Sequence, residues 1–352
     1  MPFRTNACFA PLLGDPEIRD LFSTDATLAG MLLFEQALTR ALAETGASDR
    51  ATTETALAAM GTFRPDMDAL SEGIARDGLP VPEWTRQLKA HAGSAAIGAI
   101  HVGATSQDLL DTCQSLALKQ ANRIIRQRIQ SLAGRLEELS KRFGANPLMG
   151  RTRMQAALPV TVADRVASWR RPLEKHLASL DHLGEQVEVL QFAGPVGLRD
   201  KPEGVADRVA RLMAEDLDLV YTPNGWHTDR DNVVVYGQFL TRLSGSLGKM
   251  GQDIALMAQQ GIDEVTLSGA GISSAMPHKQ NPVLAETLVA FAAYTATQSG
   301  GLAQAMVHEQ ERSGAAWTLE WLFLPPIVET AARSLGIANA LVGRIEGLGS
   351  GN

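Results

Sequence analysis

The stretch SQDLLDTCQSLALKQANRIIRQRIQSLAGRLEELSKR, residues 106–142, decides the fold class. Leucines and isoleucines recur at near-helical spacing along its whole length, from Leu109 through Ile125 to Leu139. A helix of about 30 residues is roughly 45 Å long, and an apolar pattern of that length without internal caps is typical of a helical bundle or coiled coil. The stretch therefore predicts one long helix of a bundle.

Further long helical patterns follow toward the C-terminus, at residues 161–190, 229–260, 282–312 and 316–345. Pro325 and Pro326 are expected to kink the last of them. Runs of aromatic and β-branched residues at strand spacing are scarce. We therefore predict an all-α fold made of a small N-terminal helical domain (1–105), a long central five-helix bundle (106–346) and a short Gly/Ser tail (347–352).

Composition excludes several classes of protein. The 352 residues are 45% hydrophobic and carry a net charge of -7, so a large core is possible and a nucleic-acid surface, which needs a basic face, is disfavoured. No apolar stretch approaches the roughly 18 residues of a membrane span, and the N-terminus lacks the pattern of a signal peptide. Cys8 and Cys113 are the only cysteines, which suggests neither disulfides nor a metal site. We expect a cytoplasmic protein with no membrane or nucleic-acid partner.

Polar residues gather at the joints between the expected helices. These joints read IHVGATSQD (100–108), MGRTRMQAALP (149–159), YTPNGWHTDRD (221–231) and SGAGISSAMPHKQNP (268–282). Ser106 with Asp108, and Asn281 as N-cap before Pro282, are expected to begin helices. A helix N-terminus favours carboxylate or phosphate, although plain capping explains any single joint. Several such joints together predict that function lies at helix ends.

The motifs at these joints resemble those of one known family. SSAMPHKQNP (273–282) closely resembles SSxMPxKxNP, the signature loop of the fumarase/aspartase superfamily. HVGATSQDLLDT (101–112) and GRTRMQAALPVT (150–161) resemble its first and second substrate-binding blocks. WHTDRD (226–231) and QERSGAAWTLEW (310–321) are similar to its 3-carboxy-cis,cis-muconate cycloisomerase branch. The resemblance extends from about residue 15 to residue 345.

The resemblance implies an assembly as well as a fold. Members of the fumarase/aspartase superfamily form homotetramers through the long bundle, and loops from three different subunits build each active site. The family commonly has a further small helical domain at its C-terminus. The Gly/Ser tail after residue 346 leads us to expect that this domain is absent here.

The resemblance also implies a reaction without metal or nucleotide cofactor. In this branch, which acts in protocatechuate breakdown, one carboxylate of a muconate adds across its own diene to form a lactone. A carbanion delocalised into a carboxylate must then be stabilised. Ser273 matches the serine that the family uses as base in the elimination direction, Lys279 would supply positive charge, and Asn281 would supply an amide donor. Ile272, where the family commonly has glycine, is expected to stiffen the loop.

Arg153 departs from the superfamily pattern, in which most members carry a histidine. Arginine stays protonated and is a poor proton donor. Our hypothesis is that Arg153 clamps a substrate carboxylate by a bidentate contact and that the proton comes from Lys279 or water. The alternative is that Arg153 only pairs with an acidic residue at a helix joint.

The matching motifs imply a set of substrate-binding residues for a small polycarboxylate. They are His101, Thr105, Ser106, Gln107, Thr152, Gln155, Met276, His278, Asn281 and Arg312. A lone histidine at a helix start is otherwise more often a cap or a packed side chain, and Arg312 and His278 could be ordinary ion-pair members. His227 and Arg230 fit a structural and a functional interpretation equally. His91, His176 and His182 match no motif and are expected to be solvated; Met250 and Met257 are expected in the core.

Two other functions remain open. One is a fumarate-releasing lyase that acts on a succinyl-substituted amine such as adenylosuccinate, which Arg153 and the QERSGAAWTLEW block disfavour. The other is a non-catalytic helical scaffold, which Ser273, Lys279 and Asn281 disfavour. A muconate with sulfonate in place of one carboxylate is a further substrate that Arg153 could accommodate.

Overall fold

The computed structural model describes residues 7–269, 271–272, 276 and 280–349, and this part of the chain is mostly helical. The predicted bundle is present as long helices: α7 (Ser106–Phe143), α8 (Val162–Val187), α10 (Asp231–Met257), α11 (Val283–Gln304) and α12 (Gly314–Gly343). The all-α prediction is therefore confirmed. Helix α12 continues through Pro325 and Pro326, whereas α11 ends eight residues before the expected 312.

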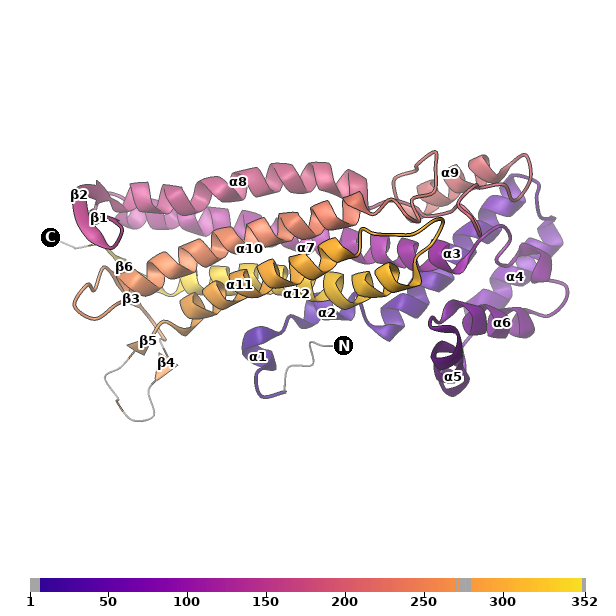
Figure 1. The fold of residues 1–352 in the computed structure, drawn as a ribbon, viewed down its shortest axis with the longest axis horizontal. Helices are drawn as coiled ribbons and strands as arrows, with labels where there is room; N and C mark the ends of the chain where they lie inside the picture. Colours follow the sequence, from indigo (N-terminus) through magenta and orange to yellow (C-terminus); the bar gives the residue numbers. More distant parts are fainter. Residues whose placement is uncertain (1–6, 270, 273–275, 277–279, 350–352) are drawn as a thin grey trace.

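The bundle helices run alternately along one long axis (Figure 1). Helices α7, α10 and α12 begin near the N-terminal helices, at what we call the α3 end after helix α3 (Thr24–Glu44). Helices α8 and α11 begin at the opposite end of the bundle, which we call the hairpin end after the hairpin of strands β1 (Pro147–Thr152) and β2 (Gln155–Thr161). With 38 residues, α7 is about 57 Å long. Residues at the starts of α7 and α8 are therefore separated by most of the length of the molecule.

Apolar stripes on the bundle helices meet in one core. On α7, Ile125, Ile129 and Leu132 are fully buried, and they belong to the same cluster as Met250 and Met257 of α10. The expected core position of both methionines is confirmed. Burying one such side chain stabilises the fold by about 1.5–3 kcal/mol, so the bundle is held mainly by this shared stripe.

A second core lies beneath the N-terminal helices. These are α1 (Ala10–Leu13), α2 (Pro16–Asp20), α3 (Thr24–Glu44), α4 (Arg50–Thr62), α5 (Met67–Asp77), α6 (Val81–Ala92) and the 3-10 helix η1 (Ile97–Ala99). Phe34 and Leu38 of α3 pack in one cluster with Val209 and Met213 of α9 (Ala206–Leu217). The N-terminal core thus includes a helix that comes after α8 in the chain, and the boundary at residue 105 stays a prediction.

Short antiparallel pairs of strands lie at the hairpin end. They are β1 (Pro147–Thr152) with β2 (Gln155–Thr161), β3 (Val265–Leu267) with β6 (Ile345–Leu348), and β4 (Gly271–Ile272) with β5 (Gln280–Asn281). Gly347 and Leu348, expected in the tail, pair with Thr266 and Val265. Within the described residues, every helix is too short or too polar to cross a lipid bilayer.

Two expected helix caps are wrong. Thr105, not Ser106, is the N-cap of α7, and its backbone N–H donates to Asp108 Oδ2 at 2.9 Å. Asn281 does not cap α11, because it pairs with Gly271 in the β4–β5 ladder and Pro282 takes the N-cap position. The extended backbone required by that ladder delays the helix to Val283.

Candidate active site

The start of α7 and the loop before α12 meet at the α3 end. Arg312 Nε donates to Gln107 Oε1 at 2.9 Å, and Arg312 Nη2 donates to Thr105 Oγ1 at 3.2 Å and to the Pro195 carbonyl at 3.3 Å. Within the described part of the chain, Arg312 forms no ion pair with a carboxylate. Its charge is thus held by neutral acceptors beside a helix N-terminus, which suits an anionic ligand.

His101 is held at the same end by a buried carboxylate. Its backbone N–H donates to Glu35 Oε2 at 2.8 Å, and its Nδ1 lies 2.6 Å from Glu35 Oε1. Glu35, on α3, is fully buried, and His101 adopts a φ of 60°, which is rare outside glycine. Glu35 was missed in the sequence because it comes 66 residues earlier, although a lone acid among the apolar residues of MLLFEQAL is a usable signal.

We expect Glu35→Gln to lower kcat/KM by about tenfold to a hundredfold, because a hydrogen bond to a charged group contributes about 1.5–3 kcal/mol. The amide would keep one contact and lose the charged acceptor that orients His101. Steady-state kinetics and the melting temperature should be measured together. Glu54→Gln, at an exposed glutamate paired with Arg50, is the matched control; equal kinetics in the two variants would exclude this function for Glu35.

Asp108 and His227 lock the first turn of α7. Asp108 is fully buried and accepts the backbone N–H groups of Ala193 and Gly194, each at 3.0 Å. His227 Nε2 lies 2.8 Å from Asp108 Oδ1, and the His227 carbonyl accepts from Gln107 Nε2 at 2.9 Å. His227 is only 4% exposed, which favours a structural role. In this role its carbonyl orients the side chain of Gln107.

Arg230 joins three helices in the same region. Its fully buried guanidinium donates to Asp111 of α7 at 2.8 Å and to Glu320 of α12 at 2.7 Å. Trp317 Nε1 donates to Asp111 as well, at 3.1 Å. Burial opposes ionisation of Glu320, yet the hydrogen bond and charge of Arg230 hold its pKa below the ordinary value. The cluster fixes the relative positions of the helix starts that carry Thr105 and Arg312.

Arg230→Met is expected to lower the free energy of unfolding by about 3–5 kcal/mol, because it leaves two buried carboxylates without their cation. Urea titration followed by circular dichroism would measure the change. Arg126→Met is the control: Arg126 pairs with Asp181 at the surface, and such a pair is worth about 0–1 kcal/mol. A loss from Arg230→Met no larger than the control would contradict the clamp.

At the hairpin end, Arg153 occupies the tip of the β1–β2 hairpin. Thr152 pairs with Gln155 across a two-residue turn, and Arg153 and Met154 both have positive φ, 49° and 66°. Such turns usually take Asn or Gly, so this backbone is strained. Arg153 is exposed and forms no ion pair within the described residues, since Glu264 pairs instead with Arg151, at 2.6 Å. The alternative in which Arg153 pairs with an acid is therefore not observed.

The signature loop begins and ends in the β4–β5 ladder, where Ile272 pairs with Gln280. Ser273, His278 and Lys279 lie outside the described residues. Met276 is 44% exposed. Asn281 borders both a pocket of about 230 Å³ and a cavity of about 900 Å³ that Met276 also lines.

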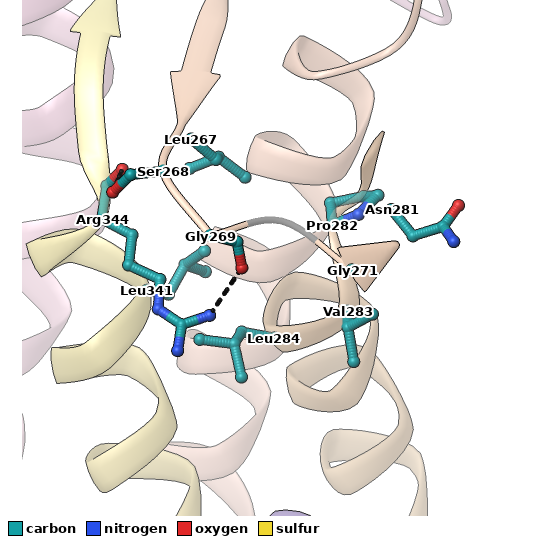
Figure 2. Close-up of a pocket in the computed structure, with 10 residues that line it drawn as sticks. All are labelled: Leu267, Ser268, Gly269, Gly271, Asn281, Pro282, Val283, Leu284, Leu341 and Arg344. Atoms are coloured by element: carbon teal, nitrogen blue, oxygen red, sulfur yellow. Dashed lines mark hydrogen bonds between the residues drawn. The ribbon is translucent and has the colours of Figure 1, made fainter. Parts of the chain in front are cut away.

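Arg344 anchors the segment that leads into β4 and the signature loop, and no motif in the sequence indicates it. Figure 2 shows its guanidinium beside Leu341 and Leu284 in the smaller pocket, where Nη1 donates to the Gly269 carbonyl at 3.1 Å. The Ser268 N–H in turn donates to the Arg344 carbonyl at 2.8 Å. The residues that follow α12 therefore fix the point from which the loop departs.

One chain does not bring all the candidate residues together. His101, Thr105, Ser106, Gln107 and Arg312 lie at the α3 end, whereas Thr152, Arg153, Gln155, Met276 and Asn281 lie at the hairpin end (Figure 1). The length of α7, about 57 Å, separates the two groups. Each end of one chain therefore holds only part of the set of candidate residues.

Comparisons with known proteins agree with the motifs. A family model described as lyase matches residues 15–295. The 3-carboxy-cis,cis-muconate cycloisomerase of Pseudomonas aeruginosa is 36% identical, over 94% of this chain and 73% of its own length. The solved 3-carboxy-cis,cis-muconate lactonizing enzyme of Pseudomonas putida superposes with a TM-score of 0.90 at 34% identity, over 97% of this chain and 77% of that one.

A second solved relative carries a different name. The fumarate lyase of Mesorhizobium sp. BNC1 superposes with a TM-score of 0.88 at 32% identity, over 96% of this chain and 76% of that one. The sequence relatives and the solved structures match over nearly the whole chain, and the family model matches residues 15–295. The chain belongs to this lyase family and thereby to the fumarase/aspartase superfamily, whose loop and blocks its sequence carries.

Proposed function

We propose that the protein is a cycloisomerase that converts 3-carboxy-cis,cis-muconate into 4-carboxymuconolactone. The observation that carries the proposal is the match to the Pseudomonas aeruginosa cycloisomerase over 94% of the chain. The site chemistry supports it, because a tricarboxylate needs several local cations in a chain whose net charge is -7. Arg312 at the α3 end and Arg153 at the hairpin tip provide such cations without a competing carboxylate among the described residues.

In the proposed reaction, an oxygen of one substrate carboxylate forms a bond to a carbon of the diene. The displaced electron pair moves onto the carbon beside another carboxylate and gives a delocalised dianion. Lys279 and Asn281 stabilise that charge, and a proton from Lys279 or water then completes the lactone. The Ser273 hydroxyl passes this proton to the carbon and is reprotonated by Lys279 or water; in the reverse direction its alkoxide, supported by the cation of Lys279, removes the same proton by the same path. Arg153 holds a carboxylate and transfers no proton.

The proposed enzyme is a homotetramer whose sites combine both bundle ends from different chains. The separation of the two groups of candidate residues by the length of α7 supports this assembly, because one small substrate cannot contact both groups of the same chain. The surface of α11 also supports it: Glu286 is its only charged residue, and its exposed positions include Ala290, Ala293 and Gly300. Such a smooth face, with Glu286 near the start of the helix as its one exposed charge, suits close packing against another helix.

We also propose a cytoplasmic location. Cys8 and Cys113 are not joined in a disulfide. Burial raises the pKa of the Cys113 thiol to about 12, which keeps it unreactive. Cysteines outside disulfides are typical of a reducing compartment.

Arg153→Lys tests the proposed clamp. We expect KM to rise by about tenfold with little change in kcat, because lysine cannot form the bidentate contact and loses about one charge-assisted hydrogen bond. Arg151→Lys, on the same hairpin but paired with Glu264, should leave KM unchanged. A KM for Arg153→Lys equal to that of the wild type would rule out the clamp.

The function is tested by adding 3-carboxy-cis,cis-muconate to the purified protein in the presence of a metal chelator. Loss of the conjugated-diene absorbance with formation of the lactone is the expected result. If the diene persists and adenylosuccinate instead yields fumarate, the protein is a fumarate-releasing lyase. If neither substrate reacts, the helical-scaffold alternative gains support and the proposal fails.

A further inference from the structure

A basic groove lies between α8 and α10, close to the middle of both helices. The cavity there measures about 720 Å³. The side chains that matter to its chemistry are Arg171, Lys175 and His176 of α8 with Arg242, Ser246 and Lys249 of α10. No candidate residue of either bundle end lines it. The groove is therefore separate from the proposed active site.

The charges in this groove are largely uncompensated. Lys249 pairs with Asp253 of the same helix. Arg171, Lys175 and Arg242 form no ion pair within the described residues, and no acidic side chain lines the cavity. Like charges gathered in one place repel each other, and the chain as a whole is acidic, at -7. An anion that enters the groove would therefore reduce the repulsion among these cations and stabilise the cluster.

Beneath the cations lies a buried polar group with an unmade hydrogen bond. His176 is 4% exposed, so its expected solvated position is wrong. Its Nε2 lies 2.9 Å from Ser246 Oγ, whereas its Nδ1 has no partner among the described residues. Burial and the charge of Arg242 lower the pKa of His176 to about 4, so the ring is neutral at pH 7. A buried polar atom without a hydrogen bond destabilises the fold, and a polar guest or a bridging water would supply the missing bond.

We propose that this groove binds a small polyanion, a molecule with two or three carboxylate or phosphate groups. Lys175 on α8 and Arg242 on α10 reach it from opposite walls, with Ser246 and His176 as the polar floor. Gly245 adds no side chain to the α10 wall, and a Cβ there would meet nothing within 4 Å, which leaves the groove open. A bound polyanion ties α8 to α10 and so stabilises the bundle.

The test is calorimetric titration of the assembled protein with tricarballylate and, separately, with pyrophosphate, at constant ionic strength. Saturable binding of either anion is expected, with a rise in melting temperature. Lys175→Gln/Arg242→Gln should weaken this binding by at least about tenfold and leave turnover unchanged. Arg208→Gln, at an exposed arginine of α9, should bind as the wild type does. Tricarballylate binding alone would identify a carboxylate site, and pyrophosphate binding alone a phosphate site.

The active site is a competing explanation for any bound tricarballylate. The titration is therefore repeated with Arg312→Gln, in which groove binding should persist. Binding that disappears in Arg312→Gln and survives in Lys175→Gln/Arg242→Gln belongs to the active site and overturns the proposal. The proposal also fails if the groove variant binds as tightly as the wild type, or if sodium chloride of equal ionic strength reproduces the whole rise in melting temperature.

Discussion

Replacing Ser273 and Lys279 together by alanine is expected to lower kcat for lactone formation by at least about a thousandfold. The reason is the dianion that develops as the carboxylate adds to the diene. Removing one preorganised donor from such a charge typically costs about a hundredfold to a thousandfold, and the change removes a full positive charge as well as the proposed proton carrier. The rate of diene loss at saturating substrate measures the effect.

Gln280→Ala is the matched control for this double variant. Gln280 is exposed in the same loop, where its backbone pairs with Ile272, and its side chain has no part in the proposed chemistry. Both proteins should keep the melting temperature of the wild type. If the double variant had the same kcat as Gln280→Ala, the loop would have no catalytic role and only a structural one.

The bundle could be predicted from sequence because its signal is local. On α7 one apolar stripe runs without a break from Leu109, in the N-terminal core, to Leu139, in the bundle core. The sequence therefore indicates both that this segment is a helix and how long the helix is. The end of α11 was harder to locate. The residues after Gln304 include good helix formers, but Gln310 has a φ of 49°, and the loop must bring Arg312 to Thr105 and Gln107. A tertiary contact thus ended the helix early.

The candidate site was only partly accessible to sequence reasoning. Motifs in the sequence indicate Thr105, Gln107 and Arg312, and the structure places Arg312 in contact with the other two. Glu35 and Arg344 have no motif, because each acts through a partner far away in the chain, His101 and Gly269. Periodicity carries no information about such long-range pairs. His176 was misjudged for a related reason, since only packing against α10 buries it.

The second large effect concerns the two bundle ends. Arg312→Gln disables the α3 end, and Lys279→Ala disables the signature loop, whose described residues Met276 and Asn281 lie at the hairpin end. Each variant alone is therefore expected to be nearly inactive. If every site combines ends from different chains, mixed tetramers contain some sites in which both ends are wild type. In an equal mixture with random assembly, each of the two ends of a site comes from the chain in which that end is wild type in about half of the cases. Both ends are therefore wild type in about a quarter of the sites.

A same-end mixture provides the control for this experiment. His101→Gln and Arg312→Gln both alter the α3 end, where His101 contacts Glu35 of α3 and Arg312 contacts Thr105. Any α3 end in a mixture of these two chains carries one change or the other, so no intact site can form. Restored activity in this control would point to recombination or residual turnover rather than to shared sites.

The most direct measurement is the rate of diene loss after the two opposite-end variants are unfolded, mixed and refolded together. Recovery of about a quarter of wild-type activity, with none in the same-end mixture, is the result predicted here. A mixture as inactive as its separate components, although mass spectrometry shows mixed tetramers, would contradict an active site built from both ends of different chains.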